Sequence, residues 1–204
     1  NKKTGERIHG VAIEYADLHS ILDAFADYFH NGQITYEAFV DGVAYGDREY
    51  VEHPEAFGVP ERNVAYVQST RKPVDDIIAF LSEHEEELDS LDIVAADTAL
   101  YQKIEEQIPL VTKSVYTTSA VSYRLEISHK NSGKATGLAY VLKLLDITPE
   151  ETVAFGDGDN DAEMLEFAGL GVAMENATEN CKAAADIVCD CCKNDGVARF
   201  LYGF

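Results

Sequence analysis

The sequence predicts an α/β protein in two parts, an α+β unit over residues 13–123 and a βαβ-type unit over residues 124–204. Apolar residues at three- and four-residue steps recur in both parts, and this spacing is typical of helices that face a core. Around Asp41-Gly42 the first part changes to a period of two, which indicates a β-hairpin. In the second part, short apolar runs alternate with helical patterns, and this alternation favours a parallel sheet.

The first part is expected to open with a helix that runs from Ile13 to about Asn31, followed by two strands within residues 33–45. Pro73 stands where a first helical turn is predicted. The remaining expected elements are read from apolar spacing: a short helix near 50–57, a strand at 64–67, a helix at 73–88, a strand at 91–95, a helix at 98–107, and strands at 109–116 and 120–128.

In the second part, helices and strands are expected to alternate to the end of the chain. The expected elements are a helix at 135–145, a helical turn at 148–151, a strand at 153–155, a helix from 162 that ends at Gly169, a strand at 170–174, a helix at 178–185, a strand at 186–188 and a helix at 194–202.

An aspartate-rich turn separates the strand that begins at Val153 from the next helix, in the run VAFGDGDNDAEML. Its acceptors Asp157, Asp159, Asn160 and Asp161 follow the carboxyl end of a strand, where open α/β sheets bind ligands. Carboxylates gathered in this way suit a hard cation such as Mg²⁺ and a phosphate bridged to it. The alternative is a polar turn that caps a helix, but several carboxylates together repel one another unless a positive charge is held there.

A calcium-binding loop is a rival interpretation, because the three aspartates stand at positions one, three and five of an EF-hand-like loop. Positions six and twelve should then be Gly and Glu, whereas this sequence has Ala162 and Ala168 there. The EF-hand interpretation therefore fails.

The charge balance argues against several classes of partner. The chain has 16 basic and 37 acidic residues, a formal net charge of −21, so nucleic acid and anionic membrane should be repelled. No apolar run is long enough to span a bilayer, and the first residues lack the apolar core of a signal peptide, so a cytoplasmic protein is expected. An anionic substrate would have to be drawn in by a local cation.

The four cysteines lie near the end, at Cys181, Cys189, Cys191 and Cys192. A zinc site is one interpretation, but the C-x-C-C spacing lacks the paired C-x-x-C of zinc ribbons and no histidine lies nearby. Reduced thiols are the preferred interpretation.

Lys134, in the loop SGKATGL, and the turn GDGDNDAEML together resemble motifs of the haloacid dehalogenase (HAD) superfamily, in particular its Cof-like branch of small-molecule phosphatases. The resemblance continues from about Glu126 to the end of the chain through GVAMENA, AADIV and NDGVARFL. It implies that residues 124–204 form the C-terminal half of a HAD-type, Rossmann-like parallel-sheet core. Residues 13–123 would then be an α+β cap domain, and residues 1–12 a hinge from an N-terminal core segment.

The resemblance also implies roles for four residues around a Mg²⁺ ion. Asp157 would ligate Mg²⁺ directly, and Asp161 would support the metal through water or through the groups around it. Asn160 would hydrogen-bond the phosphate or its neighbours. Lys134 would neutralise charge on the attacking carboxylate and on the transferring phosphoryl group.

One part of the family pattern is missing. These phosphatases attack with an Asp of a D-x-D-G-T-like motif before the cap, and no such motif occurs here. Gly156 separates Asp157-Gly158-Asp159 from its strand, and no Gly-Thr follows. Because the sequence also has no initiating Met, the chain is expected to be a fragment of a longer, active phosphatase and to be inactive by itself. The fragment is expected to associate with its missing segment or with itself, because an incomplete core exposes apolar surface.

The parent is expected to hydrolyse small phosphomonoesters, such as sugar phosphates, through an aspartyl-phosphate. Selectivity in capped phosphatases comes from the cap, so Tyr66, Arg71, Lys72 and Tyr123 are candidate selectivity residues, with a structural role as the alternative for each. The rival function is that of a non-catalytic regulatory or scaffold relative of these phosphatases.

Overall fold

A computed structural model describes residues 7–203, except for the side chain of Ala120. The chain divides between Lys130 and Asn131 into two compact units, which are described separately. The expected hinge of residues 1–12 lies partly outside the described residues, and residues 7–14 form neither helix nor strand.

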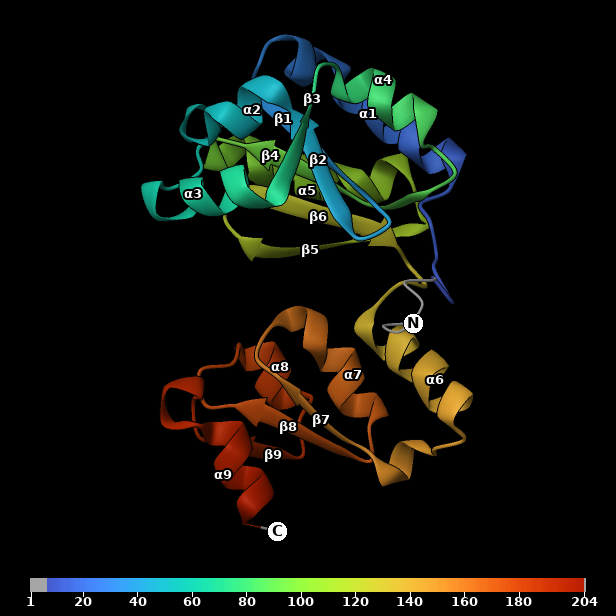
Figure 1. Ribbon diagram of the computed structural model, residues 1–204, viewed down its shortest axis with the longest axis vertical. Coiled ribbons are helices and arrows are strands. Elements are labelled where there is room, and N and C mark those ends of the chain that lie inside the picture. The colour runs from blue at the N-terminus through green and yellow to red at the C-terminus, as the bar shows by residue number, and fades with distance from the viewer. Residues whose placement is uncertain (1–6, 204) are drawn as a thin grey trace. The chain divides into compact units, whose positions relative to one another are not determined.

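The first unit is built on a mixed six-stranded sheet in the order β3-β2-β1-β4-β6-β5 (Figure 1). β2 and β3 pair in parallel, and every other neighbouring pair is antiparallel. The strands are β1 (Ile34–Val40), β2 (Val43–Asp47), β3 (Arg71–Val74), β4 (Leu88–Ala95), β5 (Val115–Val121) and β6 (Arg124–His129). Asp41 and Gly42 both adopt positive φ between β1 and β2, which confirms the predicted hairpin.

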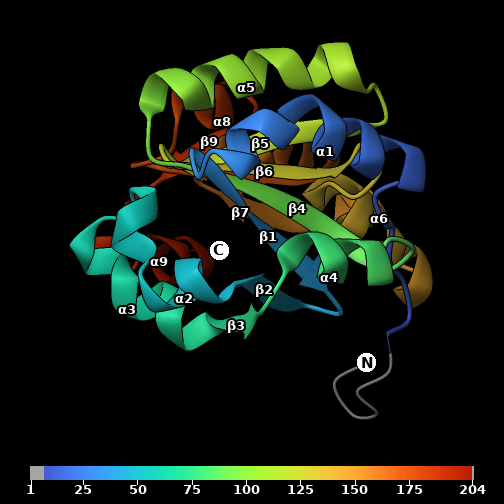
Figure 2. The ribbon, with the colours of Figure 1, turned by 90° about the horizontal axis from the view of Figure 1, so that it is seen from above.

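The helices of the first unit form two apolar clusters with the sheet. They are α1 (Tyr15–His30), α2 (Arg48–Glu52), η1 (Pro54–Phe57), α3 (Glu61–Thr70), α4 (Ile77–Glu83) and α5 (Thr98–Val111). α1 and α5 lie side by side over the sheet (Figure 2), and with α4 they bury the larger cluster against alternate residues of β1, β4 and β6. α2 and α3 form the smaller cluster with Val94 and Tyr123.

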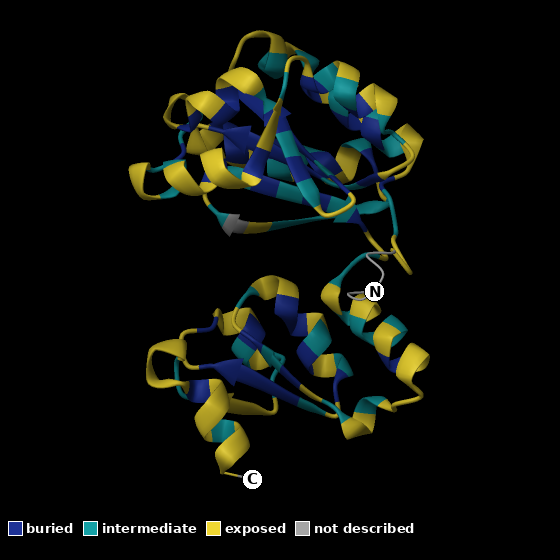
Figure 3. Ribbon diagram, viewed as in Figure 1, coloured by how far each residue is buried: buried dark blue, intermediate teal, exposed yellow. Residues whose placement is uncertain are grey.

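The second unit has a three-stranded parallel sheet, β7-β8-β9, as the alternation of strands and helices predicts. Its strands are β7 (Val153–Gly156), β8 (Leu170–Met174) and β9 (Ile187–Cys189), and its helices are α6 (Lys134–Leu145), η2 (Pro149–Glu151), η3 (Asp159–Asp161), α7 (Ala162–Phe167), α8 (Glu179–Ala183), η4 (Cys192–Asn194) and α9 (Gly196–Tyr202). Its core is small, and β8 is the most completely buried strand (Figure 3).

Several side chains of α6 and its neighbours leave apolar surface in solvent, although the apolar spacing of the sequence predicts a buried stripe. Leu142 is buried, whereas Leu144 and Leu145 are 59% and 58% exposed. Ile147 and Val153 are exposed as well. The second unit therefore leaves several large apolar side chains around α6 and at the start of β7 exposed.

Three sequence predictions are wrong in the first unit. Residues 64–67 lie in helix α3 instead of a strand, because Val64 and Val67 pack together against the smaller cluster at a helical spacing. Pro73 belongs to β3, a strand at the edge of the sheet where its missing N–H is tolerated. Pro109 lies in the last turn of α5, so the strand that follows starts only at Val115.

The division between the units falls later than residue 123, the expected end of the α+β unit. Strand β6 is the cause, because it pairs with both β4 and β5 and so belongs to the six-stranded sheet.

Among the helices of residues 7–203, none combines the length and the apolar character needed to cross a bilayer.

Candidate active site

The aspartate-rich turn follows the carboxyl end of β7 and folds back tightly on itself. A Cβ placed on Gly156 would lie 2.4 Å from the Cβ of Asp161, so only glycine allows this close approach. η3 then leads directly into α7. The strand, turn and helix predicted from the sequence are confirmed.

Asp161 anchors the turn from inside. It is 4% exposed, and its Oδ2 accepts the backbone N–H groups of Asp157 (2.9 Å) and Gly158 (3.0 Å). Its Oδ1 accepts a hydrogen bond from the ammonium of Lys134. Burial acts to raise the pKa of Asp161, but the Lys134 ammonium and the two backbone donors outweigh it and lower the pKa.

Lys134 begins α6, and its Nζ also donates to Oδ1 of Asn160 at 3.2 Å. The structure thus brings Lys134, Asn160 and Asp161 together, although 26 residues separate the lysine from the asparagine. The Lys134 side chain is 47% exposed, which leaves ammonium surface available to a further anion.

Asp157 and Asp159 are held from the other side, by the loop between β8 and α8. Asn176 Nδ2 donates to Asp157 Oδ2 at 3.5 Å, and the Thr178 hydroxyl donates to Asp159 Oδ1 at 2.6 Å. The backbone N–H of Thr178 donates to the carbonyl of Asp157 at 3.0 Å. Sequence reasoning missed Asn176 and Thr178, although the motif GVAMENA and the helix start at Thr178 were available as signals.

A model of the haloacid dehalogenase-like hydrolases matches residues 1–201, which is nearly the whole chain. The chain belongs to this hydrolase family.

Its relatives in the family include named phosphatases. A stretch of 80 residues is 50% identical to a phosphoglycolate phosphatase of Methanopyrus kandleri, over 39% of this chain and 34% of that protein. Another relative is the 5-amino-6-(5-phospho-D-ribitylamino)uracil phosphatase YitU of Bacillus subtilis, 46% identical over 77 residues, which are 38% of this chain and 28% of that protein. The matched stretches thus span about a third or less of these relatives.

Solved structures of the family share the fold. A haloacid dehalogenase-like hydrolase from Bacillus subtilis superposes with a TM-score of 0.73 at 24% identity, over 95% of this chain and 72% of that one. This likeness confirms the α/β fold class.

The oxygen donors of the turn fit a magnesium ion with a partial protein ligand set. Both oxygens of Asp161 are engaged, and one oxygen each of Asp157 and Asp159 accepts a hydrogen bond. The second oxygen of Asp157 then remains for a cation. Mg²⁺ is usually held by one or two carboxylates together with waters and substrate phosphate, so this donor set suits it.

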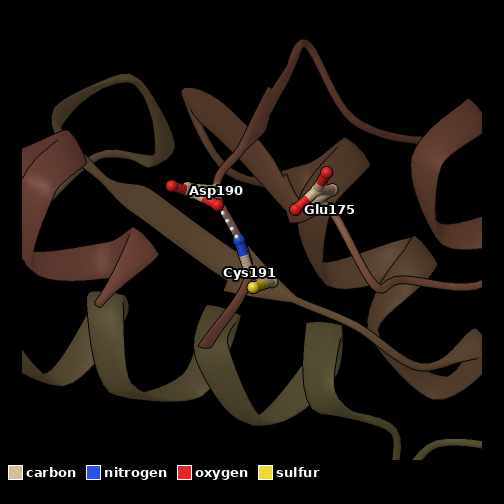
Figure 4. Close-up of side chains that lie close together, drawn as sticks. All are labelled: Glu175, Asp190 and Cys191. Carbon is tan, nitrogen blue, oxygen red and sulfur yellow. Dashed lines mark hydrogen bonds between the residues drawn. The ribbon is translucent and has the colours of Figure 1, made fainter. Parts of the chain in front are cut away.

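A second group of acidic and thiol side chains follows the ends of β8 and β9. Glu175, Asp190 and Cys191 place ligand atoms within 4.8 Å of one another, the one such group of three in the described part of the chain (Figure 4). Asp190 is already engaged, because its Oδ1 accepts the Cys191 N–H at 2.8 Å and the Asn194 amide at 2.8 Å. All four cysteines are free thiols, as the preferred interpretation expects.

Arg71, a candidate for substrate selectivity, is buried in the first unit. Its Nε and Nη2 donate to the two carboxylate oxygens of Glu37, each at 2.9 Å, and its guanidinium lies over the ring of Tyr66. The Tyr50 hydroxyl donates to Glu37 Oε1 at 2.5 Å. Arg71 therefore has a structural role, whereas Tyr66 is 59% exposed.

The other two candidates differ in exposure. Lys72 is exposed, with its ammonium 5.7 Å from the ring centroid of Tyr45. Tyr123 is buried, and its hydroxyl accepts a hydrogen bond from Asn63 at 3.1 Å. Tyr66 and Lys72 thus remain available to a ligand, and Tyr123 packs in the smaller apolar cluster.

Proposed function

We propose that this chain is part of a Mg²⁺-dependent phosphatase that hydrolyses small phosphomonoesters through an aspartyl-phosphate. The nucleophilic aspartate would lie on a segment that this chain does not contain. The observation that carries the proposal is the contact of Lys134 with Asp161 and Asn160 at the carboxyl end of β7, in a chain of this hydrolase family. The names of the two phosphatase relatives, which denote small phosphorylated substrates, support the substrate class.

Each residue of the site has a chemical task in this proposal. Lys134 offers an exposed ammonium that can neutralise charge on a phosphoryl group and on an attacking carboxylate. Asp161 fixes that ammonium and the turn, and Asp157 offers one free carboxylate oxygen to Mg²⁺. Asn160 would hydrogen-bond the phosphate. When bound, Mg²⁺ stabilises negative charge that develops on the phosphoryl oxygens.

The test is phosphatase activity of the full-length protein, assayed with Mg²⁺ and a panel of small phosphomonoesters that includes sugar phosphates. The Lys134→Met variant should lose about 10²- to 10³-fold in kcat, the usual effect of removing one group that stabilises transition-state charge. The Lys143→Met variant is the matched control, because Lys143 lies on the same helix, is exposed and has no part in the site. Equal activity of both variants would contradict the role of Lys134.

The 204-residue chain by itself should show no turnover, because the nucleophile is absent. Measurable Mg²⁺-dependent hydrolysis by the purified chain would refute that part of the proposal. A full-length protein that binds Mg²⁺ but hydrolyses nothing in the panel would favour the rival function, a regulatory or scaffold relative.

The exposed apolar side chains of the second unit support a proposal on partners. The segment that completes the core in the longer protein, or a second copy of the chain, would cover Leu144, Leu145, Ile147 and Val153.

The cytoplasmic location stays a prediction from the sequence.

A further inference from the structure

A cavity of about 640 Å³ lies in the first unit, at the end of the sheet where β1 begins and where β2 and β3 end. The last residues of α1 and the helix α2 complete its lining. Sites for small molecules typically have volumes of roughly 300–1,000 Å³. All the lining residues belong to the first unit, whereas Lys134 and the aspartate turn belong to the second, so the cavity is a candidate for a separate ligand.

The lining of this cavity carries more negative than positive charge. Its four carboxylates belong to Asp47, Glu49, Glu52 and Asp75, and its one guanidinium belongs to Arg48. Arg48 is already engaged, because its Nε and Nη2 donate to Asp75 Oδ1 at 2.9 and 2.8 Å, and its Nη1 lies 3.8 Å from Glu52 Oε1. With the lining histidines neutral, the four carboxylates and one guanidinium give a formal charge of −3.

Asp47 places part of this charge below the surface. The carboxylate is half-buried, and it accepts the Ile77 N–H at 3.0 Å and the Thr35 hydroxyl at 3.3 Å. Burial raises the pKa of Asp47, and repulsion from Asp76 and Glu49 adds to the rise, although the two hydrogen bonds act in the opposite direction. A cation bound in the cavity would relieve this repulsion.

The carboxylates are spread along the cavity instead of gathering at one point. In residues 7–203, the one group of three acidic, histidine or cysteine ligand atoms within 4.8 Å is that of Glu175, Asp190 and Cys191, which lies outside this lining. A single metal ion therefore lacks a ligand set here. The half-buried rings of Phe29 and Phe57 lie among the same lining residues. An aromatic ring attracts a cation through its face and offers apolar surface to methylene groups.

We propose that this cavity binds a linear aliphatic polyamine. Its ammonium groups would contact Asp47, Glu49 and Glu52, and the methylene segments between them would contact Phe29 and Phe57. Such a ligand matches carboxylates that are separated from one another and lie beside apolar rings, whereas an anionic ligand would be repelled by them. The proposal is independent of the phosphatase activity, because it uses no residue of the aspartate turn.

The test titrates spermidine into the full-length protein by isothermal titration calorimetry. An ionic strength of about 0.15 M screens exposed charges that are more than about 8 Å apart. One molecule of spermidine should bind per chain, and more tightly than putrescine, which has one ammonium group fewer. The double variant Glu49→Gln/Glu52→Gln should weaken the affinity about tenfold, the combined effect of losing two charge-assisted contacts at a partly exposed site.

The double variant Glu105→Gln/Glu106→Gln is the matched control. It removes the same charge from α5, another helix of the first unit, and neither residue lines the cavity. This variant should bind spermidine as tightly as the unsubstituted protein does. Glu49 and Glu52 are both exposed, so their replacement by glutamine should leave thermal unfolding nearly unchanged.

Three results would overturn the polyamine site. Equal losses of affinity in the two double variants, or several weak sites per chain, would mean that spermidine follows the overall negative charge of the protein. Absence of spermidine binding by the unsubstituted protein would overturn it directly. A loss of Mg²⁺ affinity in Glu49→Gln/Glu52→Gln as large as the loss of spermidine affinity would show a metal site instead. If this double variant fails to fold, the single variant Glu49→Gln, compared with Glu106→Gln, decides.

Discussion

Replacing Arg71 by Met should destabilise the first unit by leaving a buried carboxylate without its main partner. Glu37 is fully buried and Arg71 is 4% exposed in its side chain, and two hydrogen bonds of 2.9 Å join them. Removing one partner of a buried ion pair typically costs about 3–5 kcal/mol. Arg124 remains 3.7 Å from Glu37 Oε2, and the Tyr50 hydroxyl still donates to Oε1, so we expect the lower end, about 3 kcal/mol.

Urea denaturation followed by tyrosine fluorescence measures this change, because the chain has no tryptophan and most of its tyrosines lie before residue 130. The double variant Glu37→Gln/Arg71→Met should recover part of the loss, with a coupling free energy of about 2 kcal/mol. Arg48→Met is the matched control, since Arg48 donates to Asp75 at 2.9 and 2.8 Å but both side chains are exposed, and it should change stability little.

Two results would refute the reasoning. A loss of less than about 1 kcal/mol in Arg71→Met would mean that water or the remaining partners solvate Glu37 as well as the guanidinium does. An additive double variant would mean that the two side chains are not coupled.

Three further predictions concern the second unit. The pKa of Asp161 is lowered on folding, so its negative charge stabilises the fold above the unfolded pKa, and this stabilisation is lost as the pH falls through the folded pKa. The Asp161→Asn variant should therefore lose less thermal stability on acidification than the unsubstituted protein. An equal loss in both proteins would contradict this contribution of Asp161. Gly156→Ala should abolish Mg²⁺ binding by forcing the turn open, and calorimetry with retained affinity would show that the turn can adjust. The double variant Leu144→Glu/Leu145→Glu should reduce self-association of the 204-residue chain, as measured by sedimentation velocity. Unchanged self-association would show that these two exposed leucines have no role in it.

The site could be predicted from sequence where its residues are close together or match a known motif order. The turn from Gly156 to Asp161 follows from a strand, a glycine and a cluster of acceptors within a few residues. Lys134 was found through its place ahead of that turn, and the structure brings it onto Asp161. Thr178 was missed because its partner Asp159 is 19 residues away, and only the parallel register of β7 and β8 brings the two together.

The errors in the first unit come from tertiary context. Val64 and Val67 suit a strand or a helix equally well by local preference, and the apolar cluster under α3 decides for the helix. Pro73 fits a first helical turn or an edge strand, and pairing with Gly46 in β2 decides for the strand. Glu37 and Arg71 could not be predicted as a buried pair, because their contact depends on three strands meeting.

Every hydrogen bond described for the aspartate turn joins residues within 134–178, which all belong to the second unit. A chimaera that carries the first unit of another family member should therefore keep the cation affinity of this turn.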